Sequence, residues 1–521
     1  MKRLTNQTER ELAARAIESL LRERGEWFCA EGGARTPVGL RPGEWEIVIG
    51  GSSLQFAFLS GAGWRAWRVA AWEWAGGRLR LKAARRAGAE RTTLELVPRA
   101  SARESVAVLF AARLAASERL AQTACSCLPG GRIERVRLSG GARRSEPGRY
   151  ARVLLARGNS RVAVTGPVVA LRARDAEAFV ASALLWWARL GARAPSGGRR
   201  LSELWLVTER ELIGPVGHRL ALLREAARHD IRLFEADGGG ECLSPALTPG
   251  LAELLDAAPT FRGTFTQTPG EAARRIIALA PDAIDSIRAR HGETLRYHGL
   301  PFARIRHVSG CERVWFGLPG AAGGGRAFAA RRLLDESNWD QLAKLLDELA
   351  AHRRAAAPDA RHALYRAAPE SWLESLLRRD VTRLDPGLVV SPLHAQFRAA
   401  REASGGGSRP VDLLALRRDG RLVLIELKVA EDAALALQGA DYWRRVESHR
   451  RAGHLAAARL FGGREIADEP PLVYLAAPVF RFHRRFDDLA RLISPDIETY
   501  RFDLNEDWRA GVRVVRRTRF N

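Results

Sequence analysis

The sequence predicts an α/β protein, and three observations lead to this fold class. The chain has 521 residues, of which 46% are hydrophobic, so it can form a large buried core. A tryptophan-rich stretch from Trp27 to about Arg99 alternates like short strands separated by turns. Much of the remaining chain switches between strand-like and helix-like periodicity, which is typical of helices packed on sheets. We expect an N-terminal α+β domain over 1–130, a middle α/β domain over 131–354 and a third domain over 363–521.

The charge of the chain favours a polyanionic partner, but it has a competing explanation. The formal net charge is +23, from 83 basic and 60 acidic residues, and nucleic acid is the usual partner of such a protein. Only four of the basic residues are lysines, which leaves 79 arginines (83 − 4). A GC-rich genome produces the same skew in a chain rich in alanine and glycine. The charge alone therefore does not decide between nucleic-acid binding and codon bias.

The cysteines and the apolar stretches predict the compartment. The five cysteines are scattered and lack the spacing of a zinc site or a disulfide framework. The first 21 residues have the pattern of an amphipathic helix rather than of a signal peptide, and no run of about 18 apolar residues occurs. We therefore expect a cytoplasmic protein without a membrane span.

The N-terminal domain is expected to begin with a helix over 1–25, followed by a β-meander over 27–99 and a helix over 101–129. The meander carries several tryptophans, among them Trp45, Trp64, Trp67, Trp72 and Trp74. Such rings can form a base-stacking platform, but they more often fill the core of a small β-structure. We favour the core.

The middle domain contains the pattern of a β-α-β unit. Its expected elements are, in order, strands at 132–138 and 151–165 and helices at 174–192, 216–229 and 270–290. The helix at 216–229 lies between the strand-like segments SELWLVTE and IRLFEA, without the glycine-rich loop of a nucleotide site. Two or three strands and a helix ending near Arg354 follow, and residues 355–363 are a candidate linker.

The C-terminal domain has the clearest pattern. Its expected elements are, in order, a helix at 369–383, strands at 388–397, 411–417 and 421–429, a helix at 431–450 and a strand at 472–477. Asp419-Gly420 between two apolar runs predicts that the second and third strands form a hairpin. Pairing around this turn places Asp412 opposite the far end of the next strand. Glu426 and Lys428 share a face there, because they are two residues apart.

These three side chains suit a magnesium site. Mg²⁺ prefers oxygen ligands and takes one or two carboxylates together with waters and phosphate oxygens. Asp412 and Glu426 would supply the carboxylates, and the carbonyl group of Leu427 is a further candidate ligand. The metal would polarise a phosphodiester and lower the pKa of a bound water. Lys428 would position or deprotonate that water, or neutralise charge in the transition state, and a lysine among so many arginines indicates a need for an amine.

The pattern of Asp412, thirteen residues and then Glu426-Leu427-Lys428, between apolar strands, resembles the PD-(D/E)xK nuclease superfamily. A valine separates the proline from the aspartate, which departs from the contiguous family motif. The resemblance implies a C-terminal restriction-endonuclease-like core of α-β-β-β-α-β order, which the expected elements supply. It also implies a nuclease that hydrolyses phosphodiester bonds with Mg²⁺ or Mn²⁺, and nucleic acid, with DNA favoured, as the partner.

The same resemblance suggests further site residues. An acidic residue on the first helix often joins the metal site of the family; Glu374 is the best match, and Glu370, one turn earlier, is the alternative. Gln438 and Tyr442, four residues apart on one helix face, are similar to the Gln-x-x-x-Tyr element of RecB-type exonuclease domains, which orients the site and the substrate. Four arginines of this helix are candidates for phosphate contacts: Arg444, Arg445, Arg450 and Arg451.

Other interpretations of these residues stay open. The acids and the lysine could form a salt-bridged patch on a solvated sheet, although the flanking strands are apolar. The fold could serve as a non-catalytic module that binds nucleic acid or protein, or as an enzyme acting on another phosphorylated substrate. His449 and His454 could assist catalysis, although a solvated or hydrogen-bonded histidine is the more common case. The arginine-rich tail is either an edge that contacts DNA or a charged strand that discourages aggregation.

Overall fold

The computed structural model describes all residues except 32–37, 51–52, 61–62, 76, 86–89, 100–101, 142–146, 193–198, 238–241, 257–260, 262–267, 290–291, 309–310, 319–330, 398–409 and 521. These residues form a mixed α/β protein, which confirms the predicted fold class at this level. The chain divides into two compact units. The first comprises Met1–Ala115, Leu138–Arg149 and Leu318–Ala330, and the second comprises Ala116–Arg137, Tyr150–Gly317 and Arg331–Asn521. Among the described helices, none is both long and apolar enough to cross a bilayer.

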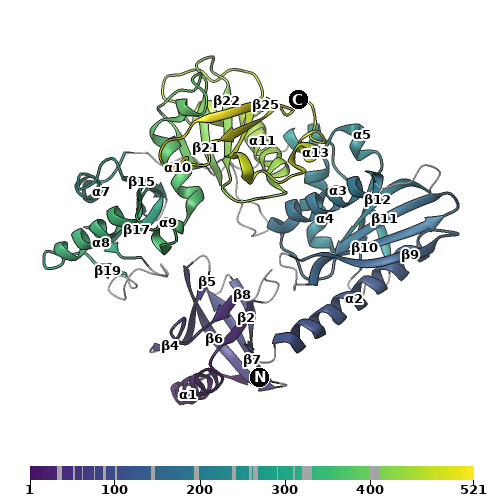
Figure 1. The fold of residues 1–521 in the computed structure, drawn as a ribbon, viewed down its shortest axis with the longest axis horizontal. Helices are drawn as coiled ribbons and strands as arrows, with labels where there is room; N and C mark the ends of the chain where they lie inside the picture. The colour runs from purple at the N-terminus through teal and green to yellow at the C-terminus, as the bar shows by residue number, and fades with distance from the viewer. Residues whose placement is uncertain are drawn as a thin grey trace. The chain divides into compact units, whose positions relative to one another are not determined.

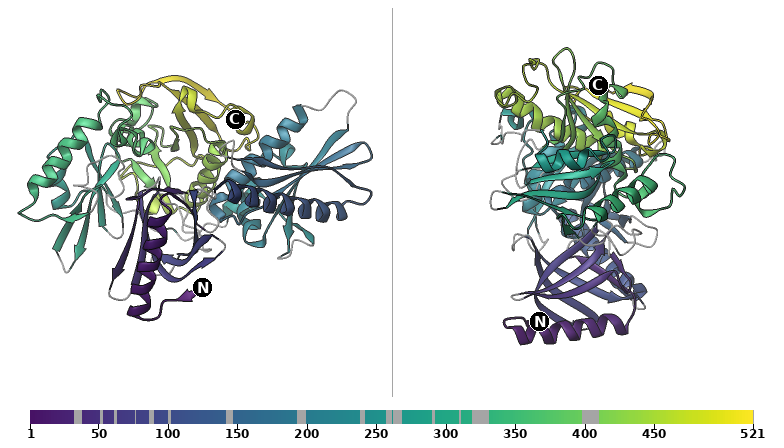
Figure 2. Two further views of the ribbon diagram at one scale, coloured as in Figure 1. Left: turned by 60° about the horizontal axis from the view of Figure 1, so that its bottom comes forward. Right: turned by 90° about the vertical axis from the view of Figure 1, so that its left-hand side faces the viewer.

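The first unit is built on an antiparallel sheet. The sheet has the order β3-β2-β8-β7-β6-β5-β4, so that β4 to β8 form the predicted meander, and β1 pairs with β6. Helix α1 (Gln7–Glu23) buries Ile17 and Leu21 in the core of this sheet (Figure 2). A capping box fixes the start of the helix, because the side chain of Asn6 accepts a hydrogen bond from the backbone N–H of Glu9. The strands are β1 (Lys2–Arg3), β2 (Trp27–Glu31), β3 (Val38–Leu40), β4 (Trp45–Gly50), β5 (Ser53–Ser60), β6 (Gly63–Ala75), β7 (Arg78–Arg85) and β8 (Glu90–Pro98).

The tryptophans of the meander mostly belong to this core. Trp67 is fully buried, as is Trp27 at the start of β2. Trp45, Trp72 and Trp74 are partly buried and pack against the same apolar cluster. This placement agrees with the interpretation of these rings as core residues rather than as a stacking platform.

The first sheet of the second unit contains the predicted β-α-β unit. It has the order β14-β13-β12-β11-β10-β9, and β12 and β13 are parallel strands connected by α4 and α5 (Figure 1). The single strand expected at 151–165 is instead two antiparallel strands, because Gly158 turns the chain with a φ of +54°. The elements are α2 (Ala102–Ser126), β9 (Arg132–Gly140), β10 (Pro147–Arg157), β11 (Ser160–Pro167), η2 (Ala173–Asp175), α3 (Ala176–Ala192), β12 (Arg200–Thr208), α4 (Arg210–Leu220), α5 (Glu225–Arg228), β13 (Ile231–Ala236), β14 (Leu243–Ala246) and α6 (Leu251–Asp256).

The second sheet, of order β15-β16-β17-β18-β19, corrects one prediction. The helix expected over 270–290 is wrong, because α7 ends at Ile277 and the residues from Ile284 onward pair with β16. Burial of Ile284 in the sheet overrides the local helical pattern. The elements are α7 (Glu271–Ile277), β15 (Ile284–Ala289), β16 (Gly292–Tyr297), β17 (Leu300–Val308), β18 (Cys311–Phe316), β19 (Arg332–Leu333) and α8 (Trp339–His352).

The third sheet follows the element order expected for the C-terminal part of the chain. Its order is β20-β21-β22-β23-β24-β25; β21 and β22 form the predicted hairpin, and β22, β23 and β24 are parallel neighbours. The arginine-rich tail forms the edge strand β25, which pairs with β24. The elements are α9 (Ala363–Arg366), α10 (Pro369–Arg379), η4 (Val381–Arg383), β20 (His394–Phe397), β21 (Val411–Leu416), β22 (Leu422–Leu427), α11 (Leu435–Arg451), α12 (His454–Ala457), β23 (Leu472–Pro478), η5 (Val479–Arg481), α13 (Phe486–Ala490), β24 (Thr499–Leu504) and β25 (Val514–Arg519).

Helix α11 is buried along most of its length because it packs on the third sheet of the second unit and on helices that accompany the first sheet of that unit, such as α3 and α4. Val216 of α4 and Trp443 of α11 belong to one continuous apolar core. Within it, the buried Arg219 of α4 donates to Glu177 of α3 at 2.7 Å and to Asp441 of α11 at 3.1 Å. The predicted middle and C-terminal domains therefore share a core.

The expected linker at 355–363 does not separate the chain into parts either. The guanidinium group of the fully buried Arg353 donates to carbonyl groups on both sides of this segment, at Tyr297, His298, Leu364 and Ala367. Burial lowers the pKa of Arg353 to about 9, and Arg509 adds to this effect. The turn between β16 and β17 also approaches α10 closely, since a Cβ atom on Gly299 would lie 1.9 Å from the carbonyl oxygen of Ser371.

Candidate active site

The open end of the β21–β22 hairpin brings together the two acids and the lysine predicted from the sequence. The antiparallel register places Asp412 beside the residues that follow Ile425. Asp412 Oδ2 accepts a hydrogen bond from the backbone N–H of Leu427 at 2.8 Å. Lys428 Nζ donates to Glu426 Oε1 at 2.5 Å and to the carbonyl oxygen of Leu427 at 3.3 Å. The hairpin thus converts a separation in sequence into a shared site.

Helix α11 adds two more of the predicted residues to this site. Gln438 Nε2 donates to Glu426 Oε1 at 2.6 Å and lies 2.9 Å from the hydroxyl oxygen of Tyr442. Both side chains are buried. Gln438 therefore fixes the orientation of the Glu426 carboxylate, and Tyr442 is hydrogen-bonded to Gln438 from one turn further along the helix.

The buried charges shift one another's protonation. Burial raises the pKa of Asp412 well above its ordinary range, and the nearby Glu426 carboxylate adds to the rise. Burial also raises the pKa of Glu426, although Lys428 opposes the shift. Burial alone would lower the pKa of Lys428, but Glu426 and Asp412 together raise it above the ordinary lysine value. Lys428 is therefore a cation at neutral pH, beside two carboxyl groups that are costly to ionise together.

Two oxygen atoms at this site test whether a divalent cation fits the residues present. Glu426 Oε2 and Gln438 Oε1 are buried and have no hydrogen-bond donor among the residues that the structure describes. A buried polar atom without a partner is costly, so each oxygen is available to a ligand. Within the described residues, no three His, Cys, Asp or Glu side chains form a metal cluster. Mg²⁺ needs only one or two protein carboxylates, so the pair of Asp412 and Glu426 fits this cation.

The acid on α10 was predicted as Glu374, with Glu370 as the alternative. Glu374 is buried and its Oε1 accepts a hydrogen bond from Arg296 of β16 at 3.1 Å. Its charge contributes to the raised pKa of Asp412, so it lies near the site, but it is held by another partner. Glu370 is exposed, and its charge acts on both Glu426 and Lys428. The electrostatic contacts thus favour Glu370 over Glu374 as the third acid.

The four arginines predicted to contact phosphates are paired with acids of their own helix. Arg444 and Arg445 bind Asp441, and Arg450 and Arg451 bind Glu447; the nitrogen–oxygen distances are 2.9, 2.5, 2.7 and 2.7 Å in that order. Arg445 is also buried. That these arginines contact phosphates stays a prediction, and the ion pairs do not support it. His449 near the end of α11 and His454 at the start of α12 contact each other, with 3.0 Å between their Nδ1 atoms.

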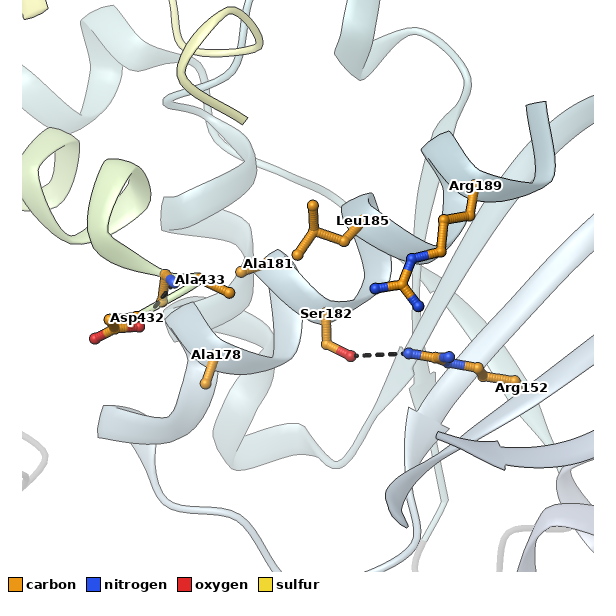
Figure 3. Close-up of a pocket in the computed structure, with 9 residues that line it drawn as sticks. Arg152, Ala178, Ala181, Ser182, Leu185, Arg189, Asp432 and Ala433 are labelled. Atoms are coloured by element: carbon orange, nitrogen blue, oxygen red, sulfur yellow. Dashed lines mark hydrogen bonds between the residues drawn. The ribbon is translucent and has the colours of Figure 1, made fainter. Parts of the chain in front are cut away.

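A second cationic feature near the hairpin was missed from the sequence. A hollow of about 170 Å³ lies between α3 and the segment that joins β22 to α11 (Figure 3). Figure 3 shows that Arg152 of β10 and Arg189 of α3 extend toward each other there, with Ser182 hydrogen-bonded to Arg152. Burial lowers the pKa of Arg152 to about 10, and Arg189 adds to the effect. An arginine within an apolar strand such as ARVLLA was the available signal.

Comparisons with known proteins leave the site to be interpreted from its own geometry. No family profile, no curated protein and no solved structure matches this chain.

Proposed function

We propose that this chain is a divalent-metal-dependent nuclease that hydrolyses phosphodiester bonds, with DNA as the favoured substrate. The observation that carries the proposal is the convergence of Asp412, Glu426 and Lys428 at one end of a buried hairpin, where Glu426 Oε2 has no hydrogen-bond donor among the described residues. The element order from α10 through β20, β21, β22 and α11 to β23 is similar to the restriction-endonuclease-like α-β-β-β-α-β core. This similarity supports the proposal, as does the net charge of +23.

Each residue has a role that follows from its contacts. Asp412 and Glu426 would hold Mg²⁺ or Mn²⁺, and the carbonyl group of Leu427 would contribute a further oxygen. A bound cation of this kind supplies Lewis acidity toward a phosphodiester oxygen and an acidified water. Gln438 holds the carboxylate of Glu426, so that its second oxygen keeps one direction. Glu370 would act as the third acid, from the first turn of α10.

Lys428 has the best-defined electrostatic role. Two neighbouring carboxyl groups keep its amine protonated, so it would act as a positive charge rather than as a base. A fixed ammonium group beside the metal would stabilise the negative charge that develops on the attacked phosphate. Of the three roles expected from the sequence, the structure therefore favours charge neutralisation and positioning over removal of a proton from water.

The test is incubation of the purified chain with supercoiled, linear and single-stranded DNA in Mg²⁺ or Mn²⁺. Lys428→Ala is expected to lower the cleavage rate by about 100-fold or more, because a preorganised charge at the transition state is lost. Lys344→Ala is the matched control, since the side chain of Lys344 is 71% exposed and lies on α8. It should cleave like the unmodified chain.

Two results would contradict the proposal. Equal cleavage by the Lys428→Ala variant and the unmodified chain would identify a contaminating nuclease. Binding of DNA without cleavage in either metal would favour the second candidate, a non-catalytic module. The hydrogen bond from Arg296 to Glu374 supports this candidate, because it occupies one acid predicted for the metal site.

A further inference from the structure

Besides the hollow at Arg152 and Arg189, another cationic hollow lies on the sheet formed by β15 to β19, away from the hairpin. It has a volume of about 200 Å³, and the described residues that line it are Arg304, Arg306, Trp315 and Arg331. Three arginines and a tryptophan thus surround one space. No described carboxylate lines it.

Strand register places most of this set on one face of the sheet. Arg304 of β17 lies directly opposite Trp315 of β18, and Arg306 lies opposite Arg313. Paired residues and residues two apart in a strand point to the same side, so these four side chains share a face. The other face is the core, where Ile305, between the two arginines of β17, is 2% exposed.

No described acidic side chain compensates this concentration of positive charge. Arg304, Arg306, Arg313 and Arg331 form no ion pair with any residue that the structure describes. Like charges directly across a sheet destabilise it. Burial lowers the pKa of Arg304 and of Arg331, and in both cases only other arginines add to the effect. A bound anion would therefore relieve a cost that the folded chain carries.

Trp315 indicates what kind of anion this is. Trp315 is half-buried, and its strand neighbours in the register are Arg304 of β17 on one side and Leu333 of β19 on the other. A flat aromatic surface among arginines binds an unpaired base by stacking while the guanidinium groups bind the adjacent phosphates. A base inside a duplex cannot offer its face in this way.

The same face of the sheet leads toward the candidate active site. Thr294 of β16 lies opposite Arg304, and Arg296, two residues along, shares its side of the sheet. Arg296 contacts Glu374 of α10, and Asp285 of β15 contacts Ser375 of α10 at 2.8 Å. The helix that carries Glu370 is thus anchored to the sheet face that holds the arginines.

We propose that Arg304, Arg306, Arg331 and Trp315 form a binding site for single-stranded nucleic acid. The inference rests on the proposed nuclease function for the choice of ligand. The site would hold a stretch of strand outside the catalytic centre, with Trp315 stacked on one base and the arginines bound to flanking phosphates.

The test is fluorescence anisotropy with a labelled single-stranded oligonucleotide, the full chain and EDTA, so that binding is measured without cleavage. Trp315→Leu is expected to weaken binding by about 5- to 150-fold, the range for loss of one stacked base. Arg304→Gln/Arg306→Gln should lower the dependence of log K on log salt by about 1.4, for two lost phosphate contacts. A duplex of the same sequence should bind more weakly and should be insensitive to Trp315→Leu.

Arg22→Gln/Arg232→Gln is the charge-matched control, because these side chains are 72% and 62% exposed and lie on α1 and β13. This control should bind like the unmodified chain. Thermal melting should show that all variants are folded, since Arg304→Gln/Arg306→Gln removes repulsion between neighbouring arginines. If the control and the test variants lose the same binding affinity, the effect comes from net charge alone and the proposed site is wrong. Two other results would contradict the proposal. One is that the unmodified chain shows no detectable binding; the other is that polyglutamate binds equally well and Trp315→Leu does not change the affinity. The cleavage assay with Lys428→Ala judges the catalytic proposal separately.

Discussion

Asp412 shows how a candidate catalytic group can oppose the stability of the fold. Its carboxyl group accepts the N–H of Leu427 but is buried close to Glu426, and the result is a raised pKa. A carboxyl group with a raised pKa binds its proton more tightly in the folded chain than in the unfolded chain. Its contribution to stability is therefore present at low pH and is lost as the pH rises from its ordinary value toward the folded pKa.

Asp412→Asn removes this ionisation while keeping an oxygen that can accept the N–H of Leu427. In EDTA, we expect the variant to match the unmodified chain near pH 4 and to be more stable by roughly 0.5–2 kcal/mol at pH 7. Urea denaturation at several pH values measures the difference. DNA cleavage in Mg²⁺ should be lost at the same time. A variant that is less stable at pH 7 would show that the carboxylate is favourable where it lies.

Among single residues, those of the candidate site that follow from local sequence patterns could be predicted. Asp412, Glu426 and Lys428 follow from a hairpin turn and two-residue periodicity, and Gln438 with Tyr442 follows from helical spacing. The choice between Glu374 and Glu370 could not be made, because it depends on Arg296, which is 78 residues away from Glu374 in the chain. No local pattern carries that contact.

At the scale of elements, the buried acids of α11 explain why its arginines were misleading. Burial alone would raise the pKa of Asp441, but Arg219, Arg445 and Arg444 lower it below its ordinary value. In the sequence these side chains have the appearance of a basic helix face. In the structure they compensate acids inside the core, and Arg219 joins them from α4.

Arg219→Ala is expected to destabilise the second unit by about 3–5 kcal/mol, because Asp441 and Glu177 lose a partner that they share inside the core. Chemical denaturation measures the loss. Arg232→Ala is the control, since its exposed pair with Glu203 should contribute less than about 1 kcal/mol. A small effect of Arg219→Ala would mean that water reaches the two acids.

Element boundaries were predictable where pattern and pairing agree. The hairpin and α10 agree with their predicted positions. The β-α-β unit is present, but its single helix expected over 216–229 is instead α4 (Arg210–Leu220) followed by α5 (Glu225–Arg228), and β15 was taken for part of a helix. The strand β24 was not predicted. For β25, a charged strand was one of the two alternatives left open, because the arginine-rich tail lacks a clear apolar alternation. Pairing with a neighbour, not local preference, makes these segments strands.

At the scale of the whole chain, the shared core replaces the division expected at 355–363. Apolar side chains of α3 and α4 cover α11, so a fragment of residues 363–521 would expose the surface that they bury. We expect this fragment to keep helical far-ultraviolet circular dichroism but to lose its near-ultraviolet signal, and to bind hydrophobic dyes. Residues 116–521 should show a cooperative transition instead. A cooperatively unfolding 363–521 fragment would contradict this expectation.

The attachment of α10 through Arg353 has a practical consequence. This cation is held by neutral carbonyl dipoles inside the protein rather than by carboxylates at the surface. Dissolved ions screen exposed charge pairs strongly but penetrate such an interior contact poorly. Concentrated sodium chloride should therefore strip co-purifying polyanions from the protein during chromatography while the start of α10 keeps its place.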